Sequence, residues 1–337
     1  MKKRFAVDEF LFEAGVTLPV EIGYETYGTL NEDRSNAILL CHYFSGTSHA
    51  GGEGGWWESL IGPGKAFDTD RYFIVASDVI SNLHPYSPNV ITTGPATINP
   101  LTGEPYGLSF PQVTIRDFVH MQRQLLQSHG IENLHCVAGP SMGGMQALTW
   151  AVEYPDAVRK VIAVISTGRT SPYTSVVPLQ IGIEAVLHAP NDSGLVTAAK
   201  ALTMQSDNLL PEIALQEMDS DPSNLIPAVD QYIKNKMETA HHYHWMYLAR
   251  ASQSYSLANG YDSYEAALSR IQAEVLAISC DTDRLFPPED SIDVVERLKQ
   301  LNKSASYFEL KSPRGHFAGV MECDQFAQPV HDFLNGQ

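Results

Sequence analysis

One short segment in the middle of the chain combines a nucleophile with a tight turn. Residues 139–143, Gly-Pro-Ser-Met-Gly, fit the pattern G-x-S-x-G and stand between a strand-like apolar run and a helix-like segment. This context is typical of a nucleophile elbow, in which a serine lies on a strained turn between strand and helix. Glycines two positions before and after the serine let the two elements approach closely. The segment therefore predicts Ser141 as a catalytic nucleophile.

A serine hydroxyl is a weak nucleophile near neutral pH, so it needs a general base that a third group orients. Behind such an elbow the partners follow in the order serine, acid, histidine. We therefore expect the base near the C-terminus, at His316, which follows the last predicted strand. The acid should follow the preceding strand. Asp281 and Asp283 both stand there, and their spacing alone does not choose between them.

Acyl transfer also requires two preorganised backbone donors for the oxyanion. The N–H of Met142, directly after the nucleophile, is one candidate, and the second should lie in the loop that includes residues 41–46. We interpret His42 in this loop as a residue that shapes the loop. The histidine-rich segment 241–244 has no Cys or carboxylate at a matching spacing, and adjacent helical histidines point apart. We therefore expect no metal site and assign that segment to a helix start or a lid contact.

The elements that must position these residues alternate between strand and helix. Two apolar runs within residues 4–28 predict paired antiparallel strands. Further strands are predicted at 37–42, 72–78, 134–139, 158–166, 273–279 and 305–312, with helices after 114, 141, 244, 287 and 319. This order predicts an α/β fold with a mostly parallel sheet covered by helices on both faces. Residues 1–170 and 241–337 form the predicted core, and residues 171–240, which lack clear strands, form a helical lid.

The composition restricts the classes of partner. The chain has 337 residues, of which 44% are hydrophobic, and its formal net charge is −17. This acidic balance argues against nucleic acid and anionic membranes as partners and leaves small-molecule substrates. We find no run of about 20 apolar residues and no signal-like N-terminus, because acidic residues interrupt it. Four scattered cysteines then indicate reduced thiols in a cytoplasmic protein.

Several longer segments are much more specific than the elbow pattern. They are GYETYGTLNEDRSNAILLCH (23–42), GWWESLIGPGKAFDTDRYFIV (55–75), TGPATINPLTGEPYG (93–107), FPQVTIRDFV (110–119) and GPSMGGMQALTWA (139–151). Together they resemble the homoserine O-acetyltransferase family of α/β-hydrolase-fold enzymes. The resemblance implies transfer of an acyl group from acyl-CoA through an acyl-serine to a hydroxyl acceptor, with no bound cofactor, in a homodimer. The family pattern Asp-x-Leu-Phe/Tyr-Pro falls on Asp283, and the second oxyanion donor falls on Phe44.

The chain departs from this family at two positions that the resemblance assigns to the acceptor. The family's Gly-His-Asp-Ala-Phe run is Gly-His-Phe-Ala-Gly here, so Phe317 replaces the Asp expected to hold an ammonium group. The lid's Gly-Leu-x-x-Ala-Arg segment matches residues 194–200, with Lys200 at best in place of the arginine. Lysine does not reproduce the bidentate contact of arginine with a carboxylate.

Three functions therefore compete. The first is an acyltransferase with Ser141, His316 and Asp283, and the second is a serine esterase or thioesterase in which water is the acceptor. A non-catalytic binding protein on this fold is disfavoured, because the nucleophile and base are both present. An acidic molecule that takes a polyanionic CoA ester also needs local positive charge, for which Lys200, Arg169 and Arg314 are candidates.

Overall fold

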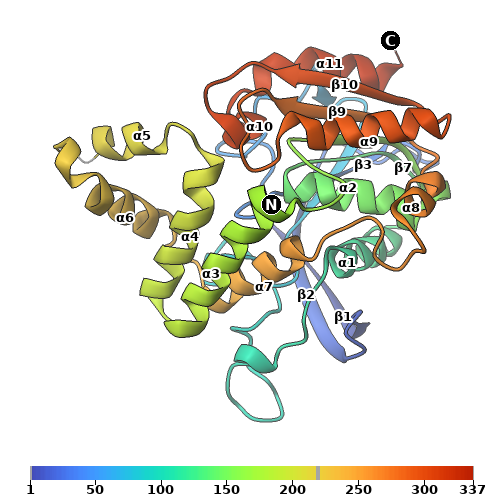
Figure 1. Cartoon of the computed structure of the whole chain (residues 1–337). Helices are drawn as coiled ribbons and strands as arrows, with labels where there is room; N and C mark the ends of the chain where they lie inside the picture. Colours follow the sequence, from blue (N-terminus) through green and yellow to red (C-terminus); the bar gives the residue numbers. More distant parts are fainter. Residues whose placement is uncertain (1, 218–220, 337) are drawn as a thin grey trace.

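A twisted eight-stranded sheet lies at the centre of the computed structural model, which describes residues 2–217 and 221–336 (Figure 1). Its strands, in spatial order, are β1 (Lys3–Leu11), β2 (Thr17–Tyr27), β6 (Phe73–Ser77), β3 (Ala37–Cys41), β7 (Leu134–Pro140), β8 (Val158–Val164), β9 (Glu274–Cys280) and β10 (Ala305–Leu310). β1 pairs antiparallel with β2 and β2 antiparallel with β6, and each further neighbour is parallel. The predicted mostly parallel sheet with an antiparallel start is confirmed.

Helices alternate with these strands. They are α1 (Ile115–Ser128), α2 (Met142–Glu153), α3 (Val177–His188), α4 (Asp192–Ser206), α5 (Leu210–Glu217), α6 (Leu225–Lys236), α7 (His242–Gln253), α8 (Tyr264–Arg270), α9 (Pro288–Gln300), α10 (Ala318–Met321) and α11 (Cys323–Asn335). The group of helices from α3 to α6 is inserted between β8 and α7. Among residues 2–217 and 221–336, every helix is too short or too polar to cross a lipid bilayer.

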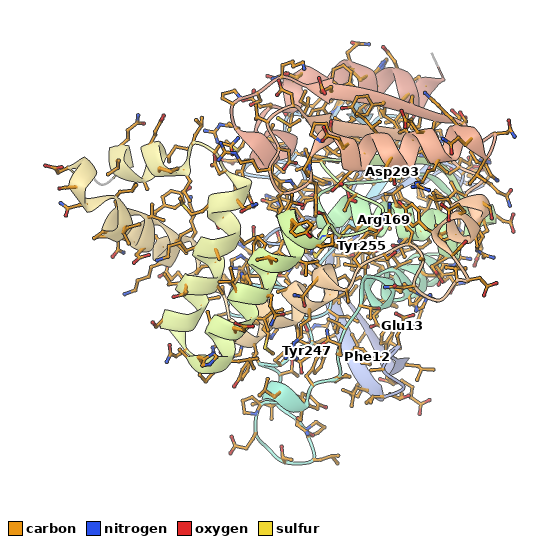
Figure 2. The ribbon with its side chains drawn as sticks, in the orientation of Figure 1. Phe12, Glu13, Arg169, Tyr247, Tyr255 and Asp293 are labelled. Carbon is orange, nitrogen blue, oxygen red and sulfur yellow. The ribbon has the colours of Figure 1, made fainter. Side chains whose placement is uncertain are left out.

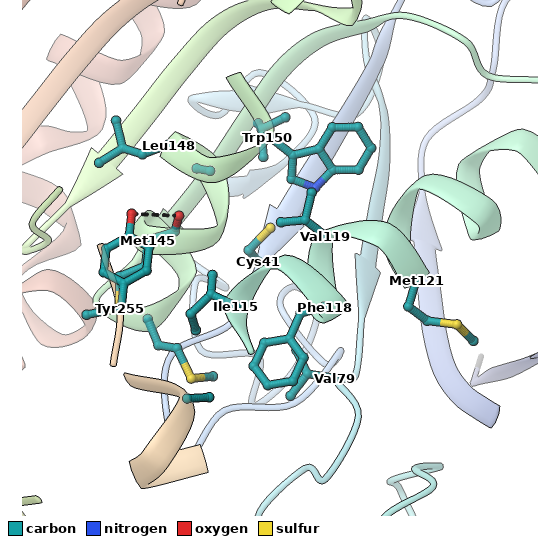
Figure 3. Packing of buried hydrophobic residues seen from close by; sticks show 14 of the residues in the cluster. Cys41, Val79, Ile115, Phe118, Val119, Met121, Met145, Leu148, Trp150 and Tyr255 are labelled. Carbon is teal, nitrogen blue, oxygen red and sulfur yellow. Dashed lines mark hydrogen bonds between the residues drawn. The ribbon is translucent and has the colours of Figure 1, made fainter. Parts of the chain in front are cut away.

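Both faces of the sheet are buried, as the continuous apolar runs of its central strands indicate. Successive residues of β3 point to opposite faces, so Leu39 packs in one apolar cluster while Ile38 and Leu40 pack in another. The first cluster lies under α1 and α2, where Figure 3 shows Phe118 and Trp150 near Cys41. The second cluster includes side chains of α11. The two layers fix the carboxyl ends of the strands, where the predicted site residues lie.

Local sequence determines where the helices begin and end. Thr114 caps α1 by accepting the N–H of Asp117, whose carboxylate accepts the N–H of Thr114 in return. Gly130, just after α1, has a φ of +69°, which glycine adopts without a steric penalty. The helix predicted after residue 244 begins slightly earlier, at His242, and ends at Gln253. Tyr255 is buried and continues the apolar pattern, but it lies in the turn beyond the helix.

Helices α3 to α6 lie beside the core (Figure 1, yellow-green to yellow), and the described residues from α3 to α6 form no strand. We interpret them as the lid predicted for residues 171–240. Neither the helix α8 nor the strand pair β4 (Ile61–Gly62) and β5 (Phe67–Asp68) was predicted from the sequence. Seven residues are two turns of helix and two residues make no alternation, so neither produces a readable period.

Candidate active site

Ser141 lies on a strained turn between β7 and α2. Its φ is +56° and its ψ is −120°, a conformation that costs a non-glycine residue energy and persists only where the surroundings enforce it. The N–H of Ser141 donates to Val164 on β8, and its carbonyl accepts the hydroxyl of Ser166 at 2.9 Å. A Cβ on Gly143 would lie 2.0 Å from the Cys41 carbonyl oxygen, so only glycine fits there. Strand and helix therefore hold this side chain in place.

His316 reaches Ser141 from the other end of the chain. It lies in a short 3-10 helix, Gly315–Phe317, after β10, and its Nε2 is 2.7 Å from Ser141 Oγ. Gly315 has a φ of +64° and donates its N–H to the Thr282 hydroxyl, which ties this loop to the loop after β9. The imidazole ring also packs edge-on against Phe286.

Asp283, and not Asp281, contacts this histidine. Asp283 Oδ2 lies 2.7 Å from His316 Nδ1, and its Oδ1 accepts the N–H groups of Leu285 and Phe286 at 2.8 and 3.0 Å. A carboxylate at Nδ1 places the ring proton there and leaves Nε2 as the acceptor that faces Ser141. Asp281 instead accepts the N–H of Ser312 and lies 3.6 Å from the Lys311 ammonium. It shapes the turn between the two loops.

The two residues expected as oxyanion donors both lie close to the nucleophile. Met142 directly follows Ser141 in the chain, and Phe44 lines the same cavity as Ser141. Met142 is the first residue of α2, where backbone N–H groups have no partner inside the helix. Phe44 lines the cavity with Ser141 and packs against Trp245. Its loop is braced by Asn82, whose amide donates to the Gly46 carbonyl at 3.0 Å.

His42 shapes this loop from within. Its Nδ1 donates to the Tyr43 carbonyl at 2.6 Å, and its Nε2 accepts from the Asn82 amide at 3.2 Å. Burial lowers the pKa of His42, which favours the neutral ring that this pairing requires. These contacts fit a loop-shaping residue rather than a proton carrier, as its sequence position indicated.

A cavity of about 580 Å³ lies between the loops that carry Ser141 and His316 and the helices of the lid. Most of the side chains that the lid contributes are apolar, among them Leu202 and Ile213. Among the lining residues that nothing in the sequence marked as site residues are Asp207, Lys236 and Trp245. Nothing in their spacing marks them, because Asp207 and Lys236 of the lid and Trp245 of α7 reach the cavity only through tertiary packing.

The two departures from the family pattern lie in different places. Phe317 lines the cavity and is half-buried, so its phenyl ring stands beside the nucleophile's partner His316. Lys200 does not line the cavity. Its ammonium pairs with Asp230 on α6, which holds two lid helices together. Lys200 therefore cannot replace the expected arginine in this arrangement.

Positive charge at the cavity differs from the sequence expectation. Of Lys200, Arg169 and Arg314, only Arg314 lines it, and Lys236 adds a second cation. Arg169 lies 3.7 Å from Asp293 of α9, and its guanidinium lies over the Tyr264 ring. Figure 2 labels Arg169 and Asp293 among the side chains of the core. The expectation for Lys200 and Arg169 was therefore wrong, because the packing of the loops and the lid decides which cations face the cavity, and the sequence does not display that packing.

The histidine-rich segment begins α7. His241 accepts the N–H of Tyr243 through its Nδ1 and so caps the helix, in agreement with the expected helix start. His244 is fully buried, donates from Nδ1 to the Asn82 carbonyl at 2.7 Å, and accepts the Ala96 N–H at Nε2. Both nitrogens of His244 are thus occupied by protein groups. No cluster of His, Cys, Asp and Glu suited to a metal occurs in the described part of the chain.

Comparison with known proteins places this geometry in a family. The profile of the alpha/beta hydrolase fold matches residues 36–320. The homoserine O-acetyltransferase of Deferribacter desulfuricans is 36% identical over 362 residues, covering 97% of this chain and 93% of that protein. The chain belongs to the homoserine O-acetyltransferase family. This confirms the resemblance seen in the sequence.

Two solved structures of similar proteins share the architecture of this chain over nearly its whole length. The homoserine O-acetyltransferase from Bacillus anthracis is 40% identical, covers 99% of this chain and 97% of its own, and superposes with a TM-score of 0.94. Esterase E22 is 35% identical, covers 99% of both chains and also has a TM-score of 0.94. The α/β-hydrolase fold is therefore confirmed, and two reaction names occur at the same structural similarity.

Proposed function

We propose that this protein transfers an acetyl group from acetyl-CoA to the hydroxyl of homoserine, with Ser141, His316 and Asp283 as its catalytic triad. The observation that carries the proposal is the hydrogen-bonded chain from Asp283 through His316 to Ser141, at the wall of a cavity of about 580 Å³. Membership of the homoserine O-acetyltransferase family supports this donor and this acceptor.

In the first half-reaction, Ser141 Oγ attacks the thioester carbonyl while His316 Nε2 accepts the hydroxyl proton. The N–H groups of Met142 and Phe44 stabilise the oxyanion of the tetrahedral intermediate. The carbon–sulfur bond then breaks, His316 returns the proton to the sulfur, and CoA leaves as the thiol. Asp283 stabilises the imidazolium and keeps the ring in the required tautomer. The product of this half-reaction is an acetyl-serine.

In the second half-reaction the acceptor hydroxyl gives its proton to His316 as its oxygen attacks the acetyl-serine. The bond from the acyl carbon to Ser141 Oγ breaks, and the serine oxygen regains a proton from His316. The enzyme returns to its starting state without a metal or an organic cofactor taking part. We expect this reaction to take place in the cytoplasm. We also expect the enzyme to be a homodimer, and light scattering would measure its mass.

Hydrolysis is the second candidate, because Phe317 places an apolar ring where the family resemblance expects a carboxylate for the acceptor. The similarity to esterase E22 points in the same direction. In that reaction water replaces homoserine as the acceptor, and the same three side chains carry out both half-reactions. The two candidates therefore differ only in how well the cavity binds an acceptor.

One assay distinguishes them. The protein is incubated with acetyl-CoA, with and without L-homoserine, and both CoA release and O-acetylhomoserine are measured. The proposal predicts that O-acetylhomoserine accounts for most of the CoA released when homoserine is present. CoA release without that product would establish hydrolysis instead, and equal release by Ser141→Ala would refute the triad.

A further inference from the structure

Two opposite charges meet on the wall of the Ser141 cavity. Asp207 directly follows α4 of the lid, and its side chain is only 4% exposed. Arg314 lies two residues before His316 on the core. Arg314 Nη1 is 3.9 Å from Asp207 Oδ2, which is too far for a hydrogen bond. The lid and the loop of the base thus each contribute one charge to the same cavity.

Asp207 has spare capacity to bind a cation. Its Oδ1 accepts the N–H of Leu209 at 3.0 Å, and no other hydrogen bond to this carboxylate forms among residues 2–217 and 221–336. A carboxylate can accept about four hydrogen bonds. Burial raises its pKa, whereas the Leu209 N–H and the Arg314 charge lower it. A buried carboxylate with so few partners is costly unless a positive group approaches it.

Arg314 has the same spare capacity for an anion. Its side chain is about three-quarters buried, and its contact with Asp207 is the only ion pair that it makes with the described residues. A guanidinium presents five N–H donors in a planar fork that matches a carboxylate. Lys236, the other cation on this wall, lies at the exposed end of α6 and offers a single point charge instead.

We propose that Asp207 and Arg314 bind the charged head of the acceptor, with the α-ammonium group at Asp207 and the α-carboxylate at Arg314. In an α-amino acid the ammonium group and the carboxylate are both bonded to the α-carbon and therefore lie close together. They suit two opposite charges on the cavity wall, of which Arg314 Nη1 and Asp207 Oδ2 lie 3.9 Å apart. The pair replaces, with different residues, the acceptor contacts that Phe317 and Lys200 do not supply. This inference rests on the proposed acyl transfer to homoserine and names the two residues that would hold the charged head of that acceptor.

The same pair could instead serve only to attach the lid to the core. Asn208 already makes such an attachment, because its amide donates to the Thr282 carbonyl at 3.1 Å. An attachment would affect every acceptor equally, whether charged or not. Recognition of an ammonium group and a carboxylate makes the effect of each substitution depend on which charge the acceptor carries.

The test combines charge-removing variants with charge-lacking acceptors. Asp207→Asn and Arg314→Gln are assayed for acetyl transfer to L-homoserine, to 3-aminopropan-1-ol, which lacks the carboxylate, and to 4-hydroxybutanoate, which lacks the ammonium group. Asp230→Asn is the matched control, because Asp230 pairs with Lys200 in the lid and does not line the cavity. Thermal unfolding of each variant is measured alongside.

Asp207→Asn should lower kcat/KM roughly tenfold or more for L-homoserine and 3-aminopropan-1-ol, and much less for 4-hydroxybutanoate, because a hydrogen bond to a charged group is lost. Arg314→Gln should show the reverse selectivity between the two analogues. Equal losses on all three acceptors, or losses no larger than those of Asp230→Asn, would overturn the inference. Should one variant not fold, the other still tests its own half of the pair. Absence of O-acetylhomoserine with the unmodified enzyme would instead be a failure of the proposed acyl transfer.

Discussion

His316 Nε2 lies 2.7 Å from Ser141 Oγ, although 175 residues separate the two in the chain. The proton on Nδ1 points to Asp283, so the nitrogen that faces the serine is the one able to accept its proton. The contact is buried on the protein side and open to the cavity on the other. This one relationship makes Ser141 chemically different from every serine that lacks a base.

We expect Ser141→Ala to abolish the acetyl-enzyme and to lower kcat by at least about a thousandfold, because the nucleophile is lost. His316→Ala should cause a similar loss, and the double variant should be no worse than either single one, since the two act as a unit. Intact-mass spectrometry after acetyl-CoA addition measures the adduct. The exposed Ser269 on α8 gives a control, because Ser269→Ala should keep both the adduct and the rate.

The two aspartates after β9 give a matched pair. Asp283→Asn should lower kcat by about a thousandfold to ten-thousandfold, because an amide at His316 Nδ1 no longer holds the required tautomer. Asp281→Asn should retain most of the rate, since within the described part of the chain the Asp281 carboxylate pairs only with the Ser312 N–H, the Lys311 ammonium and the Cys280 thiol. Steady-state rates of CoA release compare the two variants. A larger loss for Asp281→Asn would reverse our assignment of the acid.

Much of this arrangement is readable from the sequence, and the reason is local. The elbow around Ser141 and the apolar runs before it carry their own signals, and His316 follows from chain order. Asp283 needed the family resemblance, because residues 281 and 283 occupy the same turn. Arg314 was one of the three candidate cations in the sequence, but the positions of Asp207 and Lys236 depend on the packing of the lid on the core, and no periodicity in residues 171–240 encodes that packing. The ion pair of Lys200 with Asp230 was hidden for the same reason.

Phe317→Asp should raise kcat/KM for L-homoserine, by roughly tenfold if the new carboxylate contacts the acceptor's ammonium group. The ratio of O-acetylhomoserine to free acetate should rise with it, because a better-bound acceptor competes with water. Phe317→Asn is the control, because asparagine has the size of aspartate but carries no charge. If both variants change the ratio alike, removal of the phenyl ring rather than the added charge explains the result, and our account of position 317 is wrong.

Gly143→Ala should destabilise the elbow. A Cβ there would lie 2.0 Å from the Cys41 carbonyl oxygen, which is backbone and cannot rotate away. We expect a loss of about 1–3 kcal/mol in the free energy of unfolding, together with reduced activity. Gly64→Ala meets open space but a φ of +69°, so it isolates the cost of backbone strain away from the site. Urea titration of both variants, compared at equal slope, measures the difference, and an unaffected Gly143→Ala would contradict the packing argument.

Stability should fall in mild acid because of His244. Burial, with the neighbouring His241 adding to it, lowers the pKa of His244 from 6.5 to about 3, although carbonyl contacts partly oppose the shift. Below pH 6.5 the unfolded chain therefore binds a proton that the folded protein does not, so acid favours unfolding. For this residue the free energy of unfolding should fall by up to about 1.4 kcal/mol per pH unit between pH 6.5 and pH 3. His84 and His241, whose pKa values are each lowered to about 4, should add to the slope. Denaturant titrations at several pH values measure it, and His244→Gln, which cannot titrate, should reduce the slope. An unchanged slope in that variant would show that other groups carry the pH dependence.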